Sequence, residues 1–277
     1  MINLNNYIAS NEDLKTIEQG IELVWNPKLN FIFKDKAKIK NVAIISYDSK
    51  YIYLFQDRRL TKIPHRLRIK RDLHSWWRAG LLPESIEKYL PARMRGKSRF
   101  EFPIISGGLL TPFVELQKQK NQPRNPYVTR ESYLATIIHE FGHVYYSNSG
   151  AKYWFSNKEE NLGYLKTAID LYNNKLVDLS NFKISIPGYQ SLSELFAFCT
   201  DYTASAIFLP NHKRDIDVYN RKILSKLRGQ EKHRNFNFQN SVMDDPHNFA
   251  FVAGKIILAK YPNTWPQKII ELGIFYI

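Results

Sequence analysis

The stretch TRESYLATIIHEFGHVYYS, residues 129–147, carries a helical pattern and a short polar motif in the same segment of this 277-residue chain. Thr129 is a good N-cap residue, and Glu131 lies where the first turn would be. Apolar residues then recur at steps of three and four, at positions 134, 137, 138, 141 and 144. The pattern therefore predicts an amphipathic helix that contains HEFGH, residues 139–143.

The HEFGH motif has the spacing of a metal site. His143 follows His139 at a spacing of four residues, so both imidazoles lie one turn apart on one helix face and can bind a single cation. Zinc accepts such nitrogens at roughly 2.0–2.1 Å. Glu140 projects beside the ion, where its carboxylate can take a proton from water. The motif predicts a site for one zinc ion with Glu140 as general base. The alternative is a pair of helix histidines with ordinary hydrogen bonds.

A catalytic zinc ion usually has three protein ligands and one open position, so a third ligand is needed. The run after His143 has no histidine at the spacing of the extended HExxHxxGxxH motif. The candidates downstream are the acidic residues and three histidines, His212, His233 and His247. We select Glu194 because it begins an apolar, helix-like run, SLSELFAFCTD. Another interpretation stays open, since Ser191 and Glu194 have the spacing of a capping box that only stabilises a helix start.

HEFGH and the downstream ELFA, residues 194–197, together resemble the gluzincins, zinc metallopeptidases with HExxH on one helix and a glutamate ligand on a second. ELFA is similar to the E-x-F-A element of lethal-factor-like members. The resemblance spans about residues 129–208. It implies that Glu194 is the third zinc ligand and Ala197 a small residue one turn on. It also implies a catalytic role for Tyr189, because those members place a tyrosine upstream of the ligand glutamate.

The chain departs from the gluzincin pattern at Phe198, where many members have an acidic residue that orients a zinc-binding histidine. Asp201 is the nearest substitute. His247 follows Asp245 and Pro246, an N-cap and first-turn pair, so we expect it at a helix start. There it is a second candidate to donate a hydrogen bond to the developing oxyanion. The ordinary alternatives are a tyrosine packed on the core and a surface histidine.

The remaining pattern predicts an α+β fold. A helix is expected from Asn11, followed by strands at 29–33, 41–47 and 51–55, the last two joined as a hairpin by residues 48–50. Helices are expected at 153–173, 191–208, 216–227 and 246–260. With the resemblance, we expect a zincin-like arrangement. Its N-terminal subdomain, residues 1–150, has a small mixed or antiparallel sheet with a backing helix and ends in the HEFGH helix. A mostly helical subdomain, residues 151–277, carries the third ligand, and residues 72–125 form an insertion or lid.

The composition narrows the partners and the location. The 40 basic and 26 acidic residues give a net charge of +14, which favours an anionic partner unless the basic stretches only face water. These stretches are residues 58–71, 93–99 and 212–234. No run reaches the roughly 18 apolar residues of a membrane span. A single cysteine and a start without signal-peptide features predict a cytoplasmic location, although export by a dedicated machine fits equally well.

The sequence therefore predicts a zinc metallopeptidase that binds a peptide or protein substrate and hydrolyses peptide bonds, with Glu140 as the base for zinc-activated water. Two alternatives belong to other classes. One is a basic, nucleic-acid-associated protein in which zinc is structural or absent. The other is a catalytically degenerate zincin that acts as a protein-binding module.

Overall fold

The computed structural model describes residues 7–40, 42–56, 59–65, 104–109, 129–150, 188–231 and 246–274. The predicted helix at 153–173, the basic stretch at 93–99 and most of the expected insertion at 72–125 lie outside these residues. The fold is α+β, as predicted. The chain divides into two compact units, residues 1–26 with 39–140 and residues 27–38 with 141–277.

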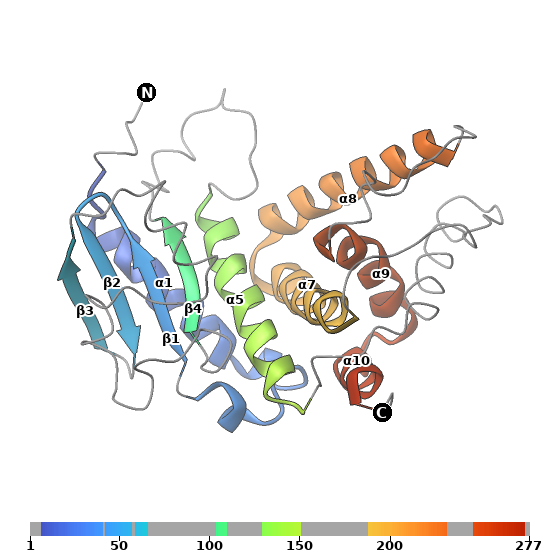
Figure 1. Ribbon diagram of the computed structural model, residues 1–277, viewed down its shortest axis with the longest axis horizontal. Coiled ribbons are helices and arrows are strands. Elements are labelled where there is room, and N and C mark those ends of the chain that lie inside the picture. Colours follow the sequence, from blue (N-terminus) through green and yellow to red (C-terminus); the bar gives the residue numbers. More distant parts are fainter. Residues whose placement is uncertain are drawn as a thin grey trace. The chain divides into compact units, whose positions relative to one another are not determined.

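The first unit contains a four-stranded mixed sheet in the order β3-β2-β1-β4 (Figure 1). Strands β1 (Ala43–Tyr47) and β2 (Tyr51–Gln56) form the predicted antiparallel hairpin, and β3 (Arg59–Pro64) continues it antiparallel to β2. Strand β4 (Ile104–Leu109) pairs with β1 in parallel. All five residues of β1 are buried, as expected for a central strand.

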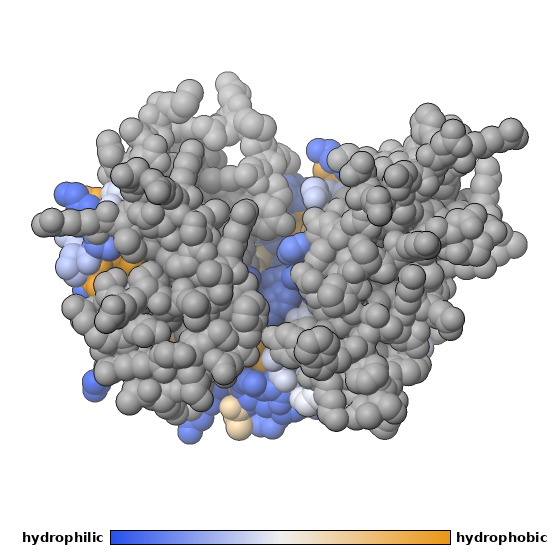
Figure 2. Space-filling view, viewed as in Figure 1, coloured by the Kyte–Doolittle hydropathy of each residue, from blue (hydrophilic) through white to orange (hydrophobic). Residues whose placement is uncertain are grey.

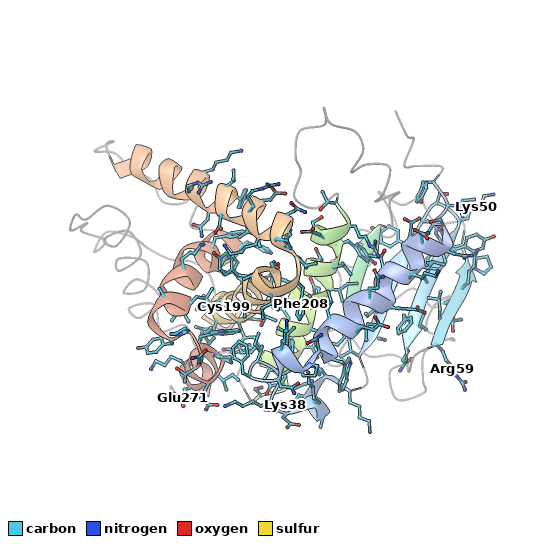
Figure 3. The ribbon with its side chains drawn as sticks, turned by 180° about the vertical axis from the view of Figure 1, so that it is seen from behind. Lys38, Lys50, Arg59, Cys199, Phe208 and Glu271 are labelled. Carbon is cyan, nitrogen blue, oxygen red and sulfur yellow. The ribbon has the colours of Figure 1, made fainter. Side chains whose placement is uncertain are left out.

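The β1–β2 turn is built around the fully buried Asp48. Its carboxylate accepts hydrogen bonds from the backbone N–H groups of Lys50 and Tyr51, both at 2.7 Å, and from Ala9 N–H at 2.9 Å. The Tyr53 hydroxyl donates a fourth bond at 2.6 Å. Four donors offset the cost of burying a carboxylate, so the turn is rigid and also holds the N-terminal segment. Lys50 in this turn lies at the opposite end of β2 from Arg59 (Figure 3).

Helix α1 (Asn11–Trp25) covers one face of this sheet, behind the strands in Figure 1 and in front of them in Figure 3. Its N-cap is Ser10, one residue before the expected start at Asn11. Ser10 Oγ accepts from Asp13 N–H at 3.2 Å and Asp13 Oδ2 accepts from Ser10 N–H at 2.8 Å, a capping box. The guanidinium of Arg130 donates to Gln19 Oε1 and so links α1 to helix α5 (Arg130–Ser147).

The predicted strand at 29–33 is wrong. The segment begins with the 3₁₀ helix η2 (Pro27–Leu29), continues as turns, and leads to a second 3₁₀ helix, η3 (Lys36–Ile39). The Phe33 N–H donates locally to the Leu29 carbonyl at 3.0 Å. Leu29, Ile32 and Phe33 are buried, which is the spacing of a helical turn and not the alternation of a strand. The apolar residues that suggested a strand therefore serve the core of the second unit.

The second unit is helical. Besides the C-terminal part of α5, it contains α7 (Gly188–Phe208), α8 (Pro210–Glu231), α9 (Pro246–Lys260) and α10 (Trp265–Ile274) (Figure 1). The predicted helix at 246–260 is confirmed. The helix predicted at 216–227 begins earlier, at Pro210, and α10 was not predicted. Phe196 of α7 lies among the aromatic rings of this core, 5.9 Å from Tyr145, 5.6 Å from Tyr146 and 5.2 Å from Trp265 between centroids.

Helices α5 and α7 approach each other closely at Gly142. A Cβ atom on Gly142 would lie 2.9 Å from the Ala197 Cα and 3.1 Å from the Thr200 Oγ1. The first distance is shorter than real Cβ contacts allow, and its partner is a backbone atom that cannot move alone. Glycine on one helix and alanine on the other therefore permit this helix pair.

Helix α9 packs against α7 through a second glycine contact. A Cβ on Gly254 would lie 2.2 Å from Phe198 Cδ1, and Phe251 meets Phe198 edge-on with centroids 4.9 Å apart. Cys199, labelled in Figure 3, is buried in this layer. These contacts fix how far along α7 the helix α9 lies. The distance between α7 and α9 matters for the candidate metal centre, because Glu194 lies on α7 and His247 on α9.

Charged side chains also link the helices of the second unit. Asp217 of α8 accepts from Lys213 Nζ at 2.8 Å and from the Tyr202 hydroxyl at 2.9 Å, and it also pairs with Lys255 of α9. Burial is the largest single effect on the pKa of Asp217 and raises it, but the three hydrogen bonds together outweigh burial and lower the pKa to about 2. The network therefore favours the ionised carboxylate and joins α7, α8 and α9.

On the face drawn in Figure 2, hydrophilic residues predominate among the described residues that are visible. None of the described helices combines the length and apolar character needed to cross a lipid bilayer.

Gly142→Ala is expected to destabilise the protein by about 1–3 kcal/mol, because the added methyl group forces α7 away from α5. Thermal or urea unfolding measures the change. Ala206→Ser, which adds one heavy atom at an exposed position of α7, is the matched control and should change stability little. Equal stability of Gly142→Ala and wild type would contradict the close approach.

Asp217→Asn is expected to lower the free energy of unfolding by about 1 kcal/mol at neutral pH, after allowance for the screening of a partly exposed group. The pKa of about 2 in the folded protein lies below the usual value of 3.8. The stabilisation is therefore full above about pH 4 and is lost as the pH falls toward 2. Urea unfolding of both proteins across this pH range tests it. A difference that stays constant down to pH 2 would contradict the assignment.

Candidate metal centre

The HEFGH motif lies on α5, as predicted. Thr129 Oγ1 accepts from Ser132 N–H at 3.1 Å, and Ser132 Oγ accepts from Thr129 N–H at 2.9 Å, so the helix start is capped reciprocally. Of the predicted apolar positions, Leu134, Ile137, Ile138 and Phe141 are buried, whereas Val144 is only half-buried. His139, Glu140 and His143 are half-buried, on the side of α5 that the core leaves open.

Three potential ligand atoms converge at this helix. One nitrogen each from His139 and His143 and one oxygen from Glu194 all lie within 4.8 Å of one another. His143 Nε2 and Glu194 Oε2 are 3.5 Å apart. Two ligand atoms of a tetrahedral zinc site, each roughly 2.0–2.1 Å from the ion, are roughly 3.3 Å apart. The observed spacing therefore fits an ion between the two side chains, and the set can hold a metal.

Glu194 is placed by α7. The helix already includes Gly188, so Ser191 lies inside it and cannot be its N-cap. The capping-box interpretation of Ser191 and Glu194 is therefore wrong, since Glu194 comes too late in the helix for that role. The Glu194 side chain is 12% exposed. A carboxylate that is mostly withdrawn from water beside imidazole nitrogens is a good metal ligand.

Ser193 holds His143 from the side away from Glu194. Ser193 Oγ and His143 Nδ1 are 2.7 Å apart, and Ser193 is buried. When Nδ1 carries the proton and donates it to Ser193, the other nitrogen, Nε2, keeps its lone pair for a metal. Ser193 was not among the site residues predicted from the sequence. Only its position directly before Glu194 could have drawn attention to it, and that position by itself indicates no contact with α5.

Of the two other predicted site residues, Tyr189 and His247, the structure describes the side chain of His247 only. Tyr189 lies in the first turn of α7, but its side chain is outside the described part of the chain. His247 lies in the first turn of α9, as expected, and its Nε2 is 3.5 Å from Glu194 Oε1. Its side chain is 55% exposed. His247 is therefore brought to the centre, next to the carboxylate of Glu194.

Asp201, the expected substitute for the missing acidic residue, is engaged elsewhere. Its Oδ1 accepts from Ser205 Oγ at 2.9 Å and lies 3.5 Å from the Nε2 of the buried His212. Among the described contacts, it is Ser193, and not Asp201, that lies against a ring nitrogen of His143. His212 was one of the candidate third ligands, and this contact places it with Asp201.

Cys199 is not a suitable ligand despite its place on α7. Burial raises the pKa of its thiol well above the usual value, so the thiol stays protonated. Its Sγ lies 4.0 Å from the Gly254 carbonyl oxygen, within the α7–α9 layer. Cys199 is therefore a buried thiol of the helical core.

Comparisons of the chain with protein-family models, with curated proteins and with solved structures found no match in any of the three.

Proposed function

We propose that this protein is a zinc metallopeptidase of the gluzincin type, with a zincin-like fold, that hydrolyses peptide bonds. The observation that carries the proposal is the convergence of His139, His143 and Glu194, from two helices, with their ligand atoms within 4.8 Å of one another. Glu140 follows His139 directly on α5 and is half-buried as well. Two imidazoles, one carboxylate and an adjacent glutamate form one of the residue sets with which zinc-dependent peptidases hydrolyse peptide bonds.

The donor atoms favour zinc over other common ions. Calcium and magnesium prefer oxygen ligands throughout, so two imidazole nitrogens argue against both. Ferrous iron also accepts two histidines and a carboxylate. The glutamate that follows the first histidine favours zinc, because it supplies the base for hydrolysis. Metal analysis of the purified protein separates zinc from iron directly.

Each residue has a defined task in the proposed reaction. A zinc ion at this centre supplies a Lewis acid that polarises the substrate carbonyl and makes water more acidic. Ser193 fixes the orientation of His143 through Nδ1. Glu140 takes a proton from the attacking water and passes it to the leaving amine. Tyr189 and His247 remain candidates for hydrogen-bond donors to the oxyanion.

The charge of the chain favours acidic substrates. A net charge of +14 raises the local concentration of anionic partners by long-range attraction. We therefore propose that the preferred substrates are peptides or proteins with acidic residues near the cleaved bond. The basic stretches of the sequence are then part of substrate capture.

The first test is metal content beside activity. Wild type is expected to hold one zinc ion, and His143→Ala and Glu194→Ala are expected to lose it, because each removes a ligand. Glu140→Gln should keep the zinc and lose peptide hydrolysis by a factor of at least about 100, because only the proton carrier changes. Elemental analysis and cleavage of a peptide library measure both properties. Full activity in Glu140→Gln, or zinc retained in both ligand variants, would refute the proposal.

Ser193→Ala is expected to weaken zinc binding by about 10- to 100-fold, because His143 loses the partner that orients its ring. Ser193→Thr keeps the hydroxyl and should bind more tightly than Ser193→Ala. Ser205→Ala is the matched control, since Ser205 is also buried on α7 but its Oγ is bonded to Asp201. Competition with a chelator of known affinity measures the constants. Equal weakening in the Ser193 and Ser205 variants would show a general effect on α7.

A further inference from the structure

The carboxylate of Glu194 lies between two imidazoles. Its Oε2 is 3.5 Å from His143 Nε2, and its Oε1 is 3.5 Å from His247 Nε2. The three residues come from three helices of the second unit, α5, α7 and α9. Each oxygen of the carboxylate therefore faces a different ring. Metal binding by one oxygen of Glu194 explains the contact with His143 but does not explain the contact with His247.

The two oxygens have different tasks. Ser193 occupies Nδ1 of His143, so Nε2 is the nitrogen of that ring that faces a metal. The oxygen beside this nitrogen, Glu194 Oε2, is then the metal-binding oxygen. Oε1 is left on the other side of the carboxylate, where His247 lies. An N–H group at that place attracts Oε1 and sets the rotation of the carboxylate about its terminal bond.

We propose that His247 is a positioning residue that holds Glu194 in the orientation needed to ligate the metal. This inference rests on the metal centre of the proposed function. A glutamate side chain has three rotatable bonds, so an unsupported Glu194 must lose conformational freedom when a metal binds. A partner on Oε1 orders the carboxylate beforehand, and partners of this kind raise the affinity of metal sites.

The packing of α9 explains why His247 reaches Glu194. The contact of Gly254 with Phe198 fixes the position of α9 along α7, and the ring contact of Phe251 with Phe198 supports it. Asn220 of α8 donates to the Phe251 carbonyl at 2.8 Å and holds α9 from a third helix. His247 thus stands on a helix whose place is set by packing, with Pro246 stiffening the first turn.

The positioning role and the oxyanion role make different predictions for the same residue. A donor that contacts only the oxyanion stabilises the transition state, so its loss lowers kcat and leaves zinc affinity unchanged. A residue that orders Glu194 acts before substrate arrives, so its loss weakens zinc binding in the absence of substrate. The affinity for zinc of the substrate-free protein therefore separates the two roles.

The experiment compares wild type with His247→Ala, His247→Gln and His65→Ala. Zinc affinity is measured by chelator competition on the full chain, and thermal unfolding without metal reports folding. His247→Ala is expected to bind zinc about 10- to 100-fold more weakly than wild type. His247→Gln places an amide N–H near the former Nε2 and should recover affinity to within about threefold of wild type. His65, whose Nε2 contacts the Asp48 carbonyl oxygen at 3.0 Å, is the control for the loss of an imidazole.

The failure of this inference differs from the failure of the proposed function. Wild type that binds neither zinc nor iron overturns both proposals. Wild type that binds zinc, with His247→Ala equal to it in affinity, overturns the positioning role alone. The positioning role is also overturned if His247→Gln is as weak as His247→Ala while both unfold at the wild-type temperature, because an N–H donor would then be insufficient. Weak binding in His247→Ala with recovery in His247→Gln supports the inference.

Discussion

The close approach of α5 and α7 at Gly142 is the constraint on which the candidate centre depends. A side chain at this position would collide with the backbone of α7 at Ala197. Without one, the two helices lie close enough for His143 on α5 and Glu194 on α7 to come within 3.5 Å. Gly142 lies between His139 and His143 in the sequence. The glycine that allows the helix contact and the two histidines of the candidate centre therefore belong to the same turn and a half of α5.

Around this contact, apolar packing and polar pairing have separate tasks. Phe196 is fully buried among the rings of Tyr145, Tyr146 and Trp265 on the core side of α7. Ser193 and Glu194, on the same helix, present polar groups to His143 of α5. Buried polar groups are costly unless they are paired, so their direction is well defined once the core is packed. The same principle governs Asp48, whose four donors hold the hairpin of the first unit.

Local sequence was sufficient where a single element carries the information. The period of apolar residues identified α5, and a four-residue spacing placed His139 and His143 on one face. The β1–β2 hairpin and the helix from Pro246 were also evident, because alternation, a short turn and a Pro at the first helical position are local signals. The strand expected at 29–33 failed for an instructive reason. Short apolar runs do not reveal whether alternate or adjacent side chains are buried, and here Ile32 and Phe33 both are.

The sequence by itself determined the candidate metal-binding side chains, the helix that carries two of them and the α+β class of the fold. Tertiary structure decided which residues from other parts of the chain contact these side chains. Three such contacts depend on how α5, α8 and α9 pack against α7: Ser193 with His143 Nδ1, Asp201 with His212, and His247 with Glu194 Oε1. Helix periodicity tells which side of one helix faces inward, but the distance and register between two helices follow from contacts such as Gly142 with Ala197 and Gly254 with Phe198. Those contacts join residues about 50 positions apart, and no local pattern encodes them.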